Sequence, residues 1–103
     1  MNPDSRGIQN IVQEVTGTAG ATAKVAFTST VSGSWVSFFN GSTINNCYVK
    51  FVARGGSAPT VSATNAFMVI YPGAERFIPI NTALYDLYVF SSGAAFTATS
   101  VTV

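Results

Sequence analysis

The stretch from Ala66 to Ile80, AFMVIYPGAERFIPI, constrains the fold most tightly, because it joins the most apolar run of the chain to two prolines and a glycine. Alternate side chains of a strand point to opposite faces, and apolar residues occupy both alternations of 67–71, so this strand is expected to be covered on both sides and central. Pro72-Gly73 predicts a type II turn, because proline presets φ at the second turn position and glycine accepts a positive φ at the third. Pro79 lacks an N–H donor, so the strand after the turn is expected at a sheet edge.

From Lys24 onward, strand-like segments alternate with turns and no helical period survives. Residues 47–53 show the clearest alternation of apolar and polar side chains, which is typical of a half-buried strand. Six or seven strands at spacings of roughly 8 to 15 residues predict an all-β fold, a small antiparallel β-sandwich or jelly-roll-like domain over residues 24–103. The side chains expected in its core are Val49, Phe51, Phe67, Val69, Phe77, Leu87 and Val89.

Residues 1–23 are more polar, and they are predicted to form an N-terminal arm outside the sandwich. Their apolar side chains fall at helical spacing: Ile8, Ile11, Val12 and Val15. Such a segment is shorter than the roughly 12 to 15 residues that an isolated helix needs, so it is expected to order only by docking, as a helix or as an extended strand. With Gly17 and Gly20 as a hinge, the arm is expected to bind another subunit. The alternative is an arm folded back on its own sheet.

Composition narrows the classes of function. At 103 residues the chain is expected to form one domain, and its 48% hydrophobic and 9% charged residues favour a protein that is packed among neighbours. The net charge of +1, without a basic run, argues against a nucleic-acid partner. The apolar runs are too short to span a bilayer and the N-terminus lacks the apolar core of a signal peptide, so no membrane partner and a place inside the cell are expected.

Candidate catalytic residues are few. The chain has no histidine and a single cysteine, Cys47, which is expected to be a buried structural thiol, so no metal, cofactor or internal disulfide is predicted. Glu75 and Asp86 could be proposed as a glycosidase pair, but no aromatic sugar platform flanks them, and the protein is predicted not to be an enzyme. The four tyrosines and Trp35 could form a glycan-binding surface, because their rings offer flat apolar faces with a polar tip. The loops 40–46 and 54–65 contain none of them, which disfavours a receptor-binding or glycan-binding adhesin.

Four segments carry a resemblance to a known group of proteins: SWVSFFN (34–40), YVKF (48–51), FMVIYPG (67–73) and LYDLYVFSSGA (84–94). Together they resemble the small virion proteins of tailed bacteriophages. The resemblance implies a structural role, most simply a capsid decoration (cement) protein that binds the outer shell and stabilises contacts between major capsid subunits, commonly as a trimer. It implies assembly in the host cytoplasm and a final place in the virion. A neck, tail or fibre-base component and an adhesin module remain alternatives.

The strands offer more apolar surface than one small core absorbs, which predicts a homo-oligomer and a partner such as the major capsid protein or another virion protein. On one strand Trp35 and Phe39 lie opposite Val36 and Phe38, and on another the predicted core face has apolar residues behind it. The side chains expected at the subunit interface are Trp35, Phe39, Leu84, Tyr88 and Phe90.

Overall fold

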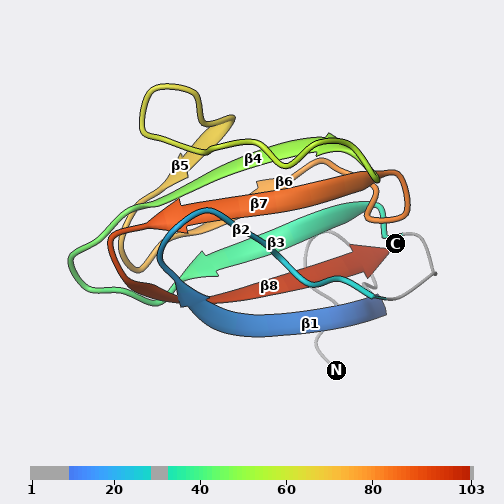
Figure 1. Cartoon of the computed structure of the whole chain (residues 1–103). Helices are drawn as coiled ribbons and strands as arrows, with labels where there is room; N and C mark the ends of the chain where they lie inside the picture. The colour runs from blue at the N-terminus through green and yellow to red at the C-terminus, as the bar shows by residue number, and fades with distance from the viewer. Residues whose placement is uncertain (1–9, 29–32, 103) are drawn as a thin grey trace.

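The computed structural model describes residues 10–28 and 33–102. No helix forms in this part of the chain, and its strands pack as two antiparallel sheets, one upon the other (Figure 1). The strands are β1 (Asn10–Ala19), β2 (Ala23–Lys24), β3 (Trp35–Asn40), β4 (Cys47–Ala53), β5 (Met68–Ile70), β6 (Glu75–Ile78), β7 (Tyr85–Ser91) and β8 (Ala94–Thr102). The predicted all-β antiparallel sandwich is confirmed.

The order of the strands is that of a jelly roll. One sheet runs β1-β8-β3-β6 and the other β2-β7-β4-β5. The first half of the chain pairs with the second half like one long hairpin: β1 with β8, β2 with β7, β3 with β6 and β4 with β5. This hairpin is then rolled up, so that β8 also pairs with β3 and β7 also pairs with β4. Two interlocked Greek keys of this kind define the jelly roll.

The core lies between the two sheets. Its largest fully buried apolar side chains are Phe38, Ile70, Ile78, Ile80, Leu87, Val36, Val49 and Val89. Of the predicted core, Val49, Leu87 and Val89 are buried, and Phe51 is half-buried and packs against the core.

Three core predictions are wrong. Val69 is only half-buried, Phe67 is 49% exposed and Phe77 is 36% exposed. On β5 and β6 the core is contacted by the other alternation, Ile70 and Ile78. A shift of one residue turns every side chain of a strand to the other face. Where apolar residues occupy both alternations, the sequence therefore does not show which alternation faces the core.

The stretch 66–80 is at an edge rather than central. β5 has three residues and ends one sheet, while β6 ends the other, as Pro79 predicted. Phe67 and Tyr71, which were expected on one covered face of this strand, flank β5 and are 49% and 61% exposed. The turn is as expected, since the Ala74 N–H donates to the Tyr71 carbonyl at 3.0 Å and Gly73 has a φ of 73°.

The N-terminal segment differs most from expectation. β1 pairs with β8 from Asn10 opposite Thr102 to Ala19 opposite Ala94, so these residues belong to the sandwich and not to a separate arm. The helical alternative is wrong. β-branched residues fit a strand, and here the backbone of β1 bonds to β8 while Val15 packs against the core. β2 runs across the boundary predicted before residue 24.

Candidate functional site

Ionisable groups do not converge in the described part of the chain. Residues 10–28 and 33–102 contain no cluster of three or more histidine, cysteine, aspartate or glutamate side chains arranged to hold a metal ion. The same residues include no helix of the length and hydropathy needed to cross a membrane. Glu75 and Asp86 lie in different sheets. Glu75 Oε2 accepts a hydrogen bond from the Ser37 hydroxyl at 2.6 Å, and Asp86 Oδ2 accepts one from the Gly55 N–H at 3.1 Å.

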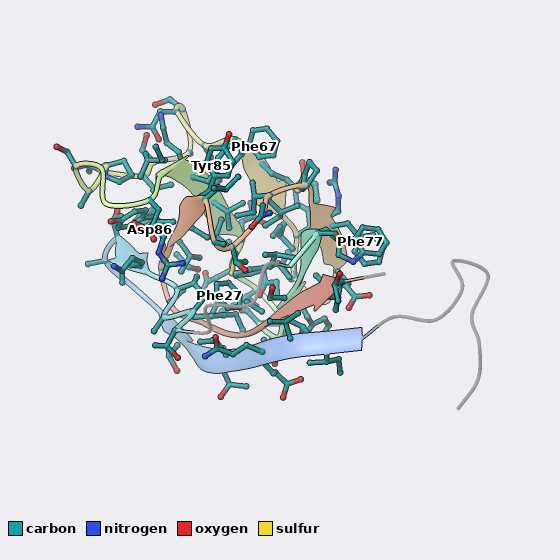
Figure 2. All side chains as sticks on the ribbon, turned by 90° about the vertical axis from the view of Figure 1, so that its right-hand side faces the viewer. Phe27, Phe67, Phe77, Tyr85 and Asp86 are labelled. Atoms are coloured by element: carbon teal, nitrogen blue, oxygen red, sulfur yellow. The ribbon has the colours of Figure 1, made fainter. Side chains whose placement is uncertain are left out.

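An aromatic surface lies on the outer face of β3 and β6. Trp35 and Phe39 alternate outward from β3, while Val36 and Phe38 between them are fully buried. Phe77 of β6 pairs in register with Ser37 and stacks on Trp35, with ring centroids 4.7 Å apart and an interplanar angle of 15°. Figure 2 shows the Phe77 ring on the outside of the sheet. We call Trp35, Phe39 and Phe77 the β3–β6 aromatic face.

A second group of rings lies at one end of the sandwich. The Phe51 ring meets Phe67 edge-on at 4.8 Å and Tyr85 edge-on at 5.3 Å. Phe67 and Tyr85 are 49% and 38% exposed, and both are labelled in Figure 2. Leu84, next along the chain, is 60% exposed. We call Phe51, Phe67 and Tyr85 the end cluster.

The predicted interface residues do not form one surface. Trp35 and Phe39 share the β3–β6 aromatic face, and Leu84 lies beside the end cluster. Phe90 lies on the outer face of the other sheet, where its ring stacks on Tyr48 with centroids 6.0 Å apart. These positions are on different sides of the molecule, so one partner surface could not contact all of them.

Tyr88 is not available to a partner, because it is only 7% exposed within the single chain. It lies in register between Lys24 of β2 and Lys50 of β4, and the segment that follows β4 crosses this outer face (Figure 1). Val61 of that segment is 2% exposed, and its N–H donates to Thr22 Oγ1 at 3.0 Å. The burial of Tyr88 on the outer face therefore depends on neighbours from distant parts of the chain, which the alternation within β7 could not predict.

The predicted arm residues are also dispersed. Ile8 lies outside the described residues. Ile11 is 67% exposed, Val12 lies at an irregularity in the β1–β8 register, and Val15 packs against the core. Helical spacing grouped side chains that a strand separates onto different faces.

Cys47 is fully buried, as predicted. Burial raises the pKa of its thiol from 9.0 to about 11, an effect that the hydrogen bond with the Ser91 side chain partly offsets. The thiol is therefore protonated at neutral pH, and since the thiolate is the reactive form, Cys47 is a structural residue.

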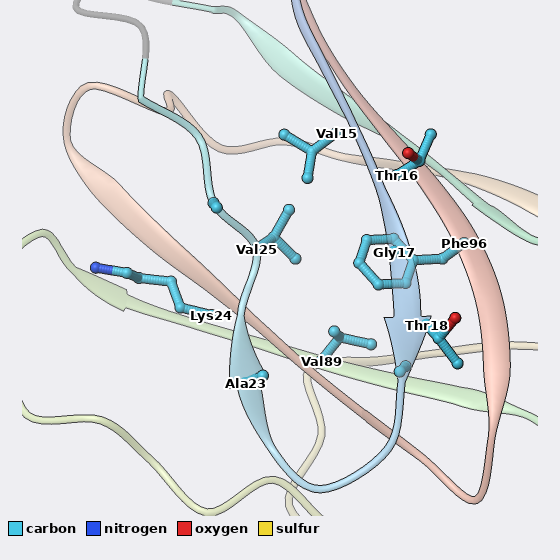
Figure 3. A pocket seen from close by; sticks show the side chains of 11 residues that line it. Val15, Thr16, Gly17, Thr18, Ala23, Lys24, Val25, Val89 and Phe96 are labelled. Carbon is cyan, nitrogen blue, oxygen red and sulfur yellow. The ribbon is translucent and has the colours of Figure 1, made fainter.

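A pocket of about 200 Å³ opens at the side of the sandwich, between β1 and the segment that begins with β2 (Figure 3). Its apolar lining includes Val15, Val25, Val89 and Phe96. The Phe96 ring projects from β8 past Gly17 of β1, where a Cβ atom would come within 3.1 Å of the ring. At the other end of β1, Gln13 closes the gap between the strands, because its Oε1 accepts a hydrogen bond from the Thr28 N–H at 2.9 Å.

No family model, no curated protein and no solved structure matches the chain. Among the rings of the β3–β6 aromatic face and the end cluster, the exposed residues that sequence reasoning missed are Phe67, Phe77 and Tyr85. In the sequence, Phe77 and Pro79 alternate with Ile78 and Ile80, and the two isoleucines are the buried pair. This alternation was the signal that Phe77 faces outward.

Proposed function

We propose that this protein is a non-enzymatic structural component of a tailed-phage particle, most simply a capsid decoration protein that binds the outer shell and stabilises contacts between major capsid subunits. The observation that carries the proposal is the β3–β6 aromatic face. Its rings stand on paired strands, and Trp35 and Phe77 are stacked on each other. Rings held in this way lose little conformational freedom when a partner covers them, which favours binding.

The fold and the composition support the same role. Viral capsid domains and lectin domains both use the jelly roll, so the fold is compatible with a virion protein. Only 9% of the residues are charged, as expected for a chain that is packed among neighbours.

The aromatic face also indicates what kind of surface it binds. Glu75 lies in register with Phe39, and its carboxylate accepts the hydrogen bond from Ser37. A partner that covers the rings would desolvate this carboxylate, which is costly unless the partner supplies a donor. The shell surface is therefore proposed to be apolar, with an arginine, a lysine or a backbone N–H placed against Glu75.

The test is the composition of purified particles, followed by binding of variants to particles that lack the protein. Phe39→Ser and Phe77→Ser change exposed rings and should leave the fold intact. Each is expected to weaken binding about tenfold, since a buried aromatic anchor contributes on the order of 1 to 2 kcal/mol. Ile44→Ser is the matched control, because Ile44 is 80% exposed but lies in the loop between β3 and β4 and not on the paired strands that carry the rings.

The proposal fails if the two phenylalanine variants bind as well as the Ile44→Ser control, or if the protein is absent from the particle. A few copies at a single vertex, instead of many over the shell, would assign it to the neck, tail or fibre base.

The end cluster favours a second candidate, a glycan-binding adhesin module. Sugars stack on exposed aromatic faces, and Tyr85 adds a hydroxyl that can hydrogen-bond to a sugar. If this function is correct, Tyr85→Ala and Phe67→Ala abolish binding to immobilised host surface polysaccharide, while Phe39→Ser does not. The reverse pattern on capsid shells supports decoration.

A further inference from the structure

The edge strands of the two sheets are protected unequally. β2 has two residues and carries Lys24, β5 has three and is followed by Pro72, and β6 has four and is followed by Pro79. Short length, lysine and proline are the usual devices that stop a sheet edge from pairing with another chain. β1 has ten residues, NIVQEVTGTA, with no lysine, arginine or proline. It therefore has none of these protections.

The outer edge of β1 is open over part of its length. Within residues 10–28 and 33–102 no strand pairs with that edge, which lies at the bottom of the sandwich in Figure 1. The link from Gln13 to Thr28 holds the segment after β2 against one end of β1. Residues 14–19 remain for a partner strand.

These open residues are complementary to themselves. Glu14, Thr16 and Thr18 pair with Thr99, Thr97 and Ala95 of β8 on the outer face, while Val15, Gly17 and Ala19 alternate with them toward the inner layer. In an antiparallel pair of two β1 strands with its two-fold axis at Thr16, the two Thr16 side chains face each other and Glu14 faces Thr18 of the second copy. Threonine pairs across strands are favourable. An axis at Glu14 would oppose two carboxylates, which is unfavourable.

The inner layer supports the same register. With the axis at Thr16, Val15 of the second copy lies opposite Gly17, at the mouth of the pocket in Figure 3. Gly17 has no side chain, and a Cβ atom there would approach the Phe96 ring to 3.1 Å, so this position of β1 leaves room beside the pocket. A valine from the partner strand, offset by one strand spacing, adds an apolar side chain next to the pocket lined by Val15, Val25 and Val89.

We infer that the open edge of β1 is a self-association surface, which joins two copies through an antiparallel β1–β1 pair centred on Thr16 and makes one continuous sheet across both. This gives a two-fold dimer rather than the trimer expected from the resemblance. β1 and β6 are the opposite ends of one sheet. The dimer thus presents two β3–β6 aromatic faces, and a bivalent protein binds an ordered surface more tightly than a single copy does.

Charge variants test both the association and its register. Thr16 and Thr18 are exposed, so lysine at either position should leave the monomer folded. Thr16→Lys places two lysines opposite each other and should raise the dimer Kd at least tenfold in sedimentation equilibrium. Thr18→Lys places a lysine opposite Glu14 of the second copy and should lower the Kd several-fold at low salt. Equal effects of the two variants would overturn the register, and a wild-type chain that stays monomeric at micromolar concentration would overturn the dimer.

A cysteine cross-link provides an independent measurement. Residues opposite each other in an antiparallel pair have Cα atoms about 4.5 to 5.5 Å apart, within the range of about 4.4 to 6.8 Å that a disulfide bridges. Thr16→Cys should therefore form a disulfide-linked dimer under mild oxidation. Thr97→Cys is the control, because Thr97 pairs with Thr16 on the same face but lies on β8, away from the edge. No cross-link from Thr16→Cys, or an equal yield from the control, would refute the β1–β1 pair.

Discussion

The buried side chain of Asn40 ties the end of β3 to two neighbouring segments, and replacing it tests how strongly these contacts stabilise the fold. Asn40 is 0% exposed. Its Nδ2 donates to the Asn45 carbonyl at 2.8 Å and to the Ile70 carbonyl at 2.9 Å, and its Oδ1 accepts from the Ser42 N–H at 2.9 Å. The side chain therefore joins the loop after β3 to the end of β5.

The expected cost of Asn40→Ala follows from these contacts. Each hydrogen bond contributes about 1 kcal/mol net, and a buried carbonyl left without a donor costs about 1 to 3 kcal/mol. The bond to Ile70 is buried, whereas those to Asn45 and Ser42 are only partly buried, so water can replace the latter two. We expect a loss of about 2 to 4 kcal/mol, a large part of the 5 to 15 kcal/mol typical of a domain.

Asn40→Asp adds a pH dependence of known sign. The introduced carboxyl can still accept from Ser42, but its second oxygen faces the Asn45 and Ile70 carbonyls. Burial and these carbonyls favour the protonated form, so the pKa of the carboxyl is raised in the folded state. The variant is then least stable at neutral pH, and its free energy of unfolding rises as the pH falls through that raised pKa.

Urea unfolding, followed by the fluorescence of the single tryptophan and by circular dichroism, measures both effects. Asn65→Ala is the matched control, because Asn65 also bonds the backbone, through Thr60 and Ser62, but is exposed. It should lose less than about 1 kcal/mol. A loss for Asn40→Ala no larger than that of the control, or an Asn40→Asp variant as stable as wild type at pH 7, would refute the reasoning.

Three further outcomes are expected in urea unfolding. Because burial raises the pKa of the Cys47 thiol from 9.0 to about 11, stability from this group is complete below pH 9 and falls by on the order of 2 to 3 kcal/mol by pH 11, a component that Cys47→Ala should remove. Leu87→Ala should cost about 2 to 5 kcal/mol, but Phe67→Ala only about 1, because Leu87 is 1% and Phe67 49% exposed; equal costs would contradict the observed faces. Gly33→Ala should cost about 1 to 3 kcal/mol, since its Cβ would clash with Ser100 Oγ, and an unchanged midpoint would show that the site relaxes freely.

Prediction from the sequence succeeded for features whose physical cause lies within one short segment. Pro72 and Gly73 restrict their own backbone angles, so their turn could be predicted, and Pro79 cannot donate to a ladder, so its strand was expected at an edge. The alternation in 47–53 likewise defined β4. The alternation within 34–39 also separated Trp35 and Phe39 from Val36 and Phe38, and the structure shows that Val36 and Phe38 are the buried pair.

The rest depended on residues that are distant in the chain. The sequence by itself determined that the chain forms short antiparallel strands with turns between them, since periodicity and turn chemistry are local. Only the tertiary structure decided that β1 pairs with β8 from the other end of the chain, that Phe77 and not Ile78 faces outward, and that Tyr88 is covered. In each case a strand could choose between two pairing partners, or a side chain between two faces, at similar local energy. The packing of the whole sandwich decides which arrangement is more stable.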